Sequence, residues 1–158
     1  QKGLAELAIG MSRARGPARK LTEDALQVVL PPGHALEAEA VLDAAALADG
    51  PLVMSGNGCE PLIRELFSAA GVTPRIVASV RDVASLLAMV RAGLGVTILP
   101  SLCRTAGAGE LIWRPLQPVS LRPLWLMTGN EVSRRARAVI AALETVCAGD
   151  GPVERSQK

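Results

Sequence analysis

The sequence predicts an α/β fold with a parallel or mixed sheet and helices on both of its faces. Short β-branched runs alternate with amphipathic runs along the chain, which is typical of sheets whose strands are linked by helices. The chain has 158 residues, enough for one domain with a sizeable core. Hydrophobic residues make up 49% of it and charged residues 20%, which favours a folded globule over a disordered chain.

The N-terminal third contains a short apolar run and one predicted strand. The apolar run at 4–9 is short, and the β-branched run at 25–32 is stopped by two prolines, which fits a strand entering a turn. Residues 11–24 are polar and contain a Gly-Pro pair, so a loop is expected there. An alanine-rich helix with a weak apolar pattern is expected at about 38–48.

The middle of the chain has the clearest alternation of strands and helices. A strand at 51–54 precedes a helix, a second strand is expected at 74–80, and a third at 95–100. Asp82 is in position to cap a second helix, which ends before Gly93. The apolar face of the first helix consists of Leu62, Ile63, Leu66, Phe67 and Ala70.

The C-terminal part predicts two strands and a helix. The strands are expected at 111–116 and 121–127, the second weakened by Pro123. The helix is expected from about 133 to 147, with a polar tail after it. The side chains expected to bury this helix are Ala136, Val139, Ile140, Leu143 and Val146.

The composition excludes several classes of enzyme and of metal site. His34 is the only histidine, so a Ser-His-Asp triad and a multi-histidine metal site both lack their parts. Cys59, Cys103 and Cys147 are widely spaced and form no CxxC pair, which indicates reduced thiols in a cytosolic protein. We therefore expect no cofactor, no metal and no enzymatic activity.

The charge and hydropathy patterns indicate neither nucleic acid nor membrane as a direct partner. The net charge is +2, and the short basic clusters at 13–20 and 134–137 are expected to be solvated. Nucleic-acid binding would call for a broader basic face or stacking aromatics, whereas the chain has no Tyr, one Phe and two Trp. No stretch reaches the ~18 consecutive apolar residues of a membrane span, and no secretory signal is visible.

The most informative stretch reads SGNGCEP and joins a predicted strand to a predicted helix. The strand ends at Ser55, and the helix begins with Cys59 in its first turn. Backbone N–H groups and the macrodipole at such a point suit an anion such as a carboxylate. Gly56 and Gly58 permit close approach to the backbone, and Ser55 and Asn57 can orient a ligand. A plain capped turn is the alternative, and the residues alone do not decide between the two.

Cys59 itself leaves two roles open. Its place in a first helical turn predicts some thiolate character, because the helix dipole favours the anion. A redox-sensing thiol is one role, and a small, partly buried residue that lines a pocket is the favoured one. A nucleotide site is disfavoured, because Gly56-x-Gly58 lacks the third glycine of the dinucleotide motif and no phosphate-binding lysine follows.

Residues 67–102 resemble the effector-binding domain of LysR-type transcriptional regulators. The runs at 28–36 and 6–10 resemble two further motifs of that family, with Ala35 in place of a customary proline and Glu6 in place of aspartate. These matches follow the family's order over most of the chain. The family signature V-x-x-G-x-G-[IV]-x-[IL]-[LI]-P is represented by Val90, Gly93, Gly95, Val96, Ile98, Leu99 and Pro100.

The resemblance implies a two-lobed α/β fold like that of type II periplasmic binding proteins, with mixed sheets. Residues 1–27 and 117–150 would be the remainder of lobe I, and residues 28–116 would be lobe II with the hinge strands at both ends. Residues 151–158 would be a polar tail. Lobe I is expected to be incomplete, with further strand–helix units upstream, and the DNA-binding winged helix-turn-helix is expected to be absent from this chain.

The resemblance also implies a site and partners. A small anionic effector would lie in the interlobe cleft, against the 55–59 corner and against Val80 and Arg81 at the start of the next helix. The protein would be a cytoplasmic homodimer, or a tetramer at full length, that touches DNA only through the missing domain. Two alternatives remain: a solute-binding receptor of the same fold, and a thiol-based redox sensor that acts through Cys59.

Overall fold

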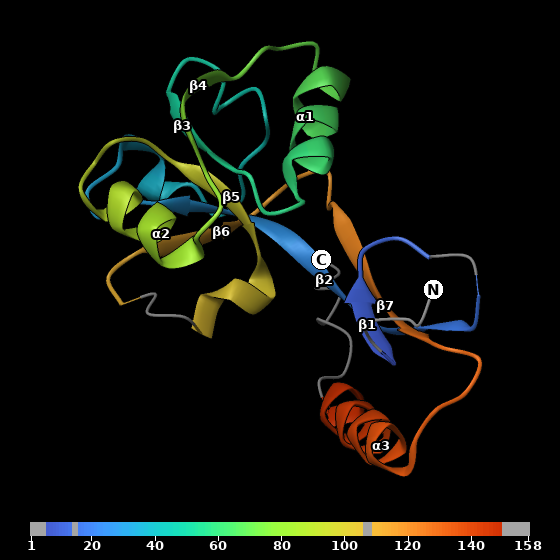
Figure 1. Cartoon of the computed structure of the whole chain (residues 1–158). Helices are drawn as coiled ribbons and strands as arrows, with labels where there is room; N and C mark the ends of the chain where they lie inside the picture. Colours follow the sequence, from blue (N-terminus) through green and yellow to red (C-terminus); the bar gives the residue numbers. More distant parts are fainter. Residues whose placement is uncertain (1–5, 14–15, 106–108, 150–158) are drawn as a thin grey trace. The chain divides into compact units, whose positions relative to one another are not determined.

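The computed structural model describes residues 6–13, 16–105 and 109–149, and the structural statements below concern these ranges (Figure 1). The start of the apolar run at 4–9 and the predicted tail at 151–158 lie outside them. The chain divides into two compact units. Unit 1 combines residues 1–23 with residues 123–158, and unit 2 is the continuous stretch 24–122. The sequence places lobe II at 28–116, within the bounds of unit 2.

Unit 2 is built on mixed strand pairing, as predicted. β3 (Pro51–Ser55) and β4 (Arg75–Val80) pair in parallel. β2 (Ala18–Leu30) is antiparallel to two neighbours, β5 (Thr97–Pro100) and β6 (Ile112–Pro115). Four of the five β2 residues at these pairings are buried, because the strand is the central one of the three: Leu26, Val28, Val29 and Leu30.

Two helices complete unit 2 (Figure 1). α1 (Glu60–Ala69) follows β3, and α2 (Val83–Arg91) follows β4 and packs against both strands. Asp82 caps α2 as predicted, since its Oδ2 accepts the Ser85 N–H at 2.7 Å. The buried side chains of the two helices are Ile63, Phe67, Leu86, Leu87 and Val90.

The second glycine of the family signature lies where β3 approaches the residues before β5. A Cβ added to Gly95 would lie 2.3 Å from the carbonyl oxygen of Pro51, so only glycine fits there. Beside it the Val96 N–H donates to the Pro51 oxygen at 2.9 Å, and the Val53 N–H donates to the Val96 oxygen at 2.8 Å. The buried Thr97 hydroxyl also donates to the Val53 oxygen at 2.7 Å. These bonds join the β3–β4 pair to the strand that continues into β5.

Unit 1 combines antiparallel strands with one helix. β1 (Leu7–Gly10) pairs with β7 (Leu121–Thr128), which forms despite its internal proline. α3 (Arg134–Gly149) occupies the predicted position. Arg19 of β2 forms an ion pair with Glu144 of α3. In the described ranges, no helix has both the length and the apolar character that a membrane span requires.

The segment at 38–48 is not the helix that its alanines predict. A single 3₁₀ turn, η1 (Ala35–Ala38), forms there, followed by bends and turns. The Leu42 N–H donates to the Pro115 oxygen at 3.0 Å, and the Gln117 N–H donates to the Leu42 oxygen at 2.8 Å. These long-range backbone bonds fix the segment against β6, and they outweigh the weak preference of alanine for a helix.

Two further expectations from the sequence are wrong. β2 begins at Ala18, inside the stretch expected to be a loop, because that part of the strand pairs with β7 in the order β1-β7-β2-β5. Val139 and Val146 of α3, expected to be buried, are 50% and 67% exposed.

Candidate functional site

The corner between β3 and α1 has the shape that the sequence predicts. β3 ends at Ser55, and Cys59 is the N-cap residue of α1. Between them Gly58 has a φ of +84°, a value that strains any residue with a Cβ. Pro61 follows in the first turn, where its missing N–H costs the helix nothing.

The second predicted segment lies directly against this corner. The Gly56 N–H donates to the Val80 oxygen at 2.9 Å. A Cβ added to Gly56 would lie 3.2 Å from the Ser79 hydroxyl and 3.3 Å from the Cγ of Arg81. The two segments named from the sequence are therefore neighbours in unit 2. The Gly56 N–H is already bonded, however, so it is not a free donor for an anion.

Ser55 is the buried polar residue of the corner. It is 2% exposed. The buried side-chain N and O atoms without a partner in the described ranges are Gln27 Oε1 and Trp113 Nε1, and the Ser55 hydroxyl is not one of them. The capped-turn alternative needs a bond from Ser55 or Asn57 to α1. The described residues contain none, and the Cys59 side chain makes no capping bond either.

An ion pair beside Cys59 is the feature that sequence reasoning missed. The Nε of Arg122 donates to Oδ1 of Asp24 at 2.9 Å, and its Nη2 donates to Oδ2 at 2.8 Å. The pair is thus bidentate, and the two side chains are only 14% and 3% exposed. Nη1 of Arg122 lies 3.8 Å from Sγ of Cys59, which places the guanidinium at the N-terminus of α1.

A sequence signal for this pair did exist. Asp24 immediately precedes the predicted strand at 25–32, and Arg122 lies near the start of the one at 121–127. Opposite charges near the starts of two strands are compatible with a cross-strand pair. The two residues are 98 positions apart in the sequence, which hides the relation.

The electrostatics of the corner contradict the expected thiolate. Burial raises the pKa of the Cys59 thiol above its ordinary value, and the nearby Arg122 charge offsets this only in part. Burial likewise raises the pKa of Cys103, which packs against the core of unit 2. For Arg122 burial acts to lower the pKa, but the hydrogen bond and charge of Asp24 raise it overall. At neutral pH the corner therefore holds neutral thiols beside a firmly charged guanidinium.

A metal ion is held by several ligating side chains that lie close together. The described ranges contain no group of three or more His, Cys, Asp or Glu side chains that are placed to hold a metal ion. His34 has a structural partner instead, because its Nδ1 accepts the Leu36 N–H at 3.2 Å at the start of η1. All three cysteines are free thiols.

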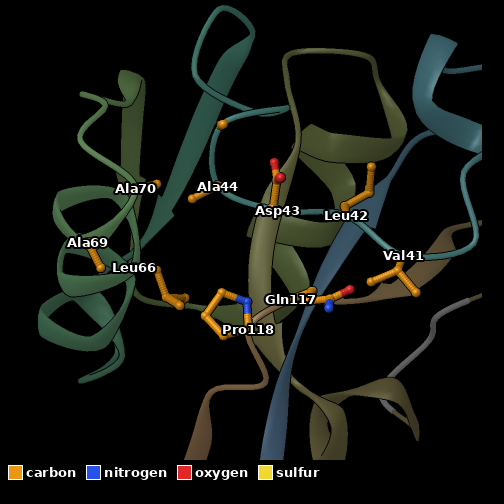
Figure 2. A pocket seen from close by; sticks show the side chains of 10 residues that line it. Val41, Leu42, Asp43, Ala44, Leu66, Ala69, Ala70, Gln117 and Pro118 are labelled. Carbon is orange, nitrogen blue, oxygen red and sulfur yellow. The ribbon is translucent and has the colours of Figure 1, made fainter.

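A separate cavity of about 490 Å³ lies elsewhere in unit 2. Figure 2 shows its mostly apolar walls, formed by Leu66 and Ala69 of α1, by the 41–45 segment and by Pro118. Gln117 adds a polar side chain to the lining. None of the predicted site residues lines this cavity, so it is distinct from the corner.

The chain matches the family model described as LysR substrate binding domain over residues 1–148. It is 29% identical over 102 residues to the Hca operon transcriptional activator HcaR of Escherichia coli (strain K12), covering 61% of this chain and 34% of that protein. It is 34% identical over 82 residues to the malonate utilization transcriptional regulator of Klebsiella pneumoniae, covering 51% and 27%. The chain thus spans about a third or less of the length of these relatives.

Solved structures share the fold. The CcmR regulatory domain of Synechocystis PCC6803 in complex with 2-PG has a TM-score of 0.79 at 16% identity, covering 91% of this chain and 74% of that one. The effector-binding domain of QuiR in complex with shikimate has a TM-score of 0.75 at 22% identity, covering 92% and 73%. These similarities confirm the predicted fold, the α/β architecture of type II periplasmic binding proteins.

Proposed function

The chain belongs to the LysR substrate-binding domain family, and from this premise we propose that it senses a small anionic metabolite on behalf of a transcription regulator. The matched curated relatives are named as transcriptional regulators, which supports a regulatory and non-enzymatic role. Two structural neighbours are complexes with small molecules, which supports ligand sensing. Such a regulator works in the cytoplasm, where the DNA is.

The observation that carries the proposed site is the contact between the β3–α1 corner and the Val80–Arg81 segment, where the Gly56 N–H donates to the Val80 oxygen at 2.9 Å. The corner leads into the N-terminus of α1, where anions are stabilised. Gly58 gives the corner its tight backbone, and Val80 and Arg81 form the facing segment. We assign the effector-contacting residues to this corner and this facing segment.

The effector acts by shifting a conformational equilibrium of the whole regulator. A ligand can shift such an equilibrium only by its differential affinity for the two states. We propose that the full-length protein is a homodimer or tetramer and that its DNA contacts come from another part of the protein. The two states of the regulator would then differ in how the DNA-contacting part is arranged.

The two alternatives have less support. A thiol-based redox sensor needs a reactive thiolate, whereas burial raises the pKa of Cys59 and leaves the residue only 2% exposed. An exported solute receptor would fold in an oxidising compartment, whereas the three cysteines are free.

A thermal-shift screen of small carboxylates tests the proposal. A carboxylate at about 100 times its Kd should stabilise the protein by roughly 2.7 kcal/mol. Ser55→Val removes the hydroxyl and should weaken or abolish the shift. Ser68→Ala removes an exposed hydroxyl from α1 and should leave it unchanged. The proposal fails if no carboxylate stabilises the wild-type chain, or if Ser55→Val responds as the wild type does.

A further inference from the structure

The cavity shown in Figure 2 has the size of a small-molecule site. Its volume of about 490 Å³ lies within the range of about 300–1,000 Å³ that ligand pockets usually have. Small side chains leave this space open: Ala44 and Ala45 line it from the 41–45 segment, and Ala69 and Ala70 line it from the end of α1. A larger side chain at any of these positions would take up part of the space.

Backbone hydrogen bonds hold the walls of this cavity in place. The Leu42 N–H donates to the Pro115 oxygen at 3.0 Å, and the Gln117 N–H donates to the Leu42 oxygen at 2.8 Å, so this wall is tied to the end of β6. On the opposite wall the Ala70 N–H donates to the Leu66 oxygen at 3.2 Å. The cavity is therefore formed before a ligand arrives, which lowers the cost of binding.

The polar groups of the cavity favour a ligand that donates hydrogen bonds and carries a positive charge. Of the described residues that line it, Asp43 alone is charged. Its Oδ1 accepts the Ala46 N–H at 2.8 Å, and its Oδ2 accepts no hydrogen bond within the described ranges. Gln117 also lines the cavity, and its side-chain oxygen is a second acceptor.

The end of α1 adds a second negative element to the same cavity. The helix ends at Ala69 with Ala70 as its C-cap residue, and both residues line the cavity. A helix C-terminus carries about half a negative charge, which a basic side chain in the last turn often balances. The last turn of α1 has no basic residue, and Arg64 pairs with Glu60 at the start of the helix instead. A carboxylate and an unbalanced helix end thus share one mostly apolar cavity.

We propose that this cavity binds a small organic cation, namely an amine with an aliphatic or aromatic body. The apolar walls receive the body of the ligand, and its ammonium group donates to the Asp43 carboxylate and to the side-chain oxygen of Gln117. The negative end of α1 stabilises the same charge. This ligand differs in charge and in place from the anion proposed for the β3–α1 corner, so the inference does not rest on the proposed function.

An NMR titration of the isotope-labelled chain with paired probes tests this inference. The probes are phenethylamine and phenethyl alcohol, which share an apolar body and differ in charge at neutral pH. At low salt the amine should bind about 3- to 30-fold more tightly than the alcohol, the combined effect of a helix end and a solvent-accessible ion pair. The backbone signals that shift should belong to residues 42–45 and 66–70. In about 1 M salt, where charges are screened within about 3 Å, the preference should shrink.

Two variants and a control show whether the charge and the space of the cavity select the ligand. Asp43→Asn removes the charge, while its amide oxygen can still accept the Ala46 N–H, and its preference for the amine should fall below about 2-fold. Asp49→Asn is the matched control, because Asp49 is an exposed acid just before β3 that does not line the cavity, and it should keep the wild-type preference. Ala69→Phe fills part of the cavity from an exposed position on α1 and should weaken both probes. Circular dichroism verifies that each variant is folded.

Three results would overturn the inference. The cavity is not a ligand site if neither probe shifts the signals of its two walls. Asp43 does not select the cation if the folded Asp43→Asn variant keeps the wild-type preference, or if Asp49→Asn loses it equally. If no probe binds and sedimentation shows a wild-type dimer that Asp43→Asn separates, the cation is a side chain of a second copy of the chain. None of these results concerns the β3–α1 corner, so the proposed function would stand in each case.

Discussion

Replacing Gly95 by alanine tests the close contact between β3 and the strand that leads into β5. The added Cβ would lie 2.3 Å from the carbonyl oxygen of Pro51 and 2.9 Å from its carbonyl carbon, distances that real Cβ atoms do not tolerate. Backbone atoms cannot rotate away as a flexible side chain can, so the two segments must separate. Gly95→Ala should therefore disrupt the bonds on either side of the contact.

The magnitude follows from the bonds that are lost. The two backbone bonds between Val96 and β3 each contribute about 0.5–1.5 kcal/mol, and the buried bond from the Thr97 hydroxyl to Val53 contributes a similar amount. Together they predict a loss of about 3 kcal/mol from the free energy of unfolding of unit 2. For comparison, whole domains are stable by about 5–15 kcal/mol.

Urea denaturation measures the effect. Trp113 lies in the core of unit 2, so its fluorescence in a Trp125→Phe background reports on that unit. With a urea dependence of about 2 kcal/mol per M, the midpoint should fall by roughly 1.5 M. Gly109→Ala is the control, because an added Cβ there meets no atom within 4 Å.

Gly93→Ala shows how much stability is lost through backbone strain alone, without a collision of the added Cβ. Gly93 has a φ of +77° with nothing near its would-be Cβ, so its replacement should cost only the backbone strain of about 1–2 kcal/mol. If Gly95→Ala lowers the midpoint no more than Gly109→Ala does, the close approach of the two segments is refuted. A loss equal to that of Gly93→Ala would show that strain, not collision, is the cause.

Three further predictions concern single side chains. The hydrogen bonds from Ser85 lower the pKa of Asp82, so its stabilisation of α2 is fully present above the ordinary aspartate pKa and is lost as pH falls through the lowered one. Urea denaturation should therefore give wild type and Asp82→Ala different free energies of unfolding at neutral pH and nearly equal ones in acid. A difference that does not change with pH would contradict this. Cys59 should react with iodoacetamide more slowly at pH 7 than an ordinary exposed thiol, because burial raises its pKa, and Arg122→Gln should slow it further by removing a charge that lowers that pKa. Mass spectrometry across pH would show fast alkylation if the thiolate were instead favoured. Val146→Gln should change stability by less than about 0.5 kcal/mol, since the side chain is 67% exposed, and a larger loss would mean that something covers it.

Local sequence patterns were sufficient to predict most of the secondary structure and the position of the corner between β3 and α1. The Asp82 cap involves residues three apart, and the bend at Gly58 depends on its own φ, so short stretches of sequence contain both signals. The family signature likewise marks Gly95, although only the structure shows that this glycine is required by the nearby Pro51. Features determined within one turn or one hairpin are those that sequence reasoning recovers.

Features set by distant partners were missed. The 38–48 segment forms no helix because Leu42 bonds to the backbone at 115 and 117, more than 70 residues away. The pKa of Cys59 depends on its burial and on Arg122, neither of which its neighbours in sequence reveal. Helix propensity at 38–48 and the helix dipole at Cys59 are local effects, and tertiary contacts outweighed both of them.

The continuity of unit 2 has a consequence for the order in which the protein folds. Unit 1 is made of two segments separated by about 100 residues, the whole of unit 2. Joining them across an unfolded loop of that length costs about 4 kcal/mol of chain entropy. Once unit 2 has folded, Asp24 and Arg122 hold its two ends within a hydrogen bond of each other, and the ladder between β1 and β7 closes across a short distance. Unit 2 should therefore fold first, and loss of the Asp24–Arg122 pair should slow the formation of unit 1, although unit 1 contains neither residue.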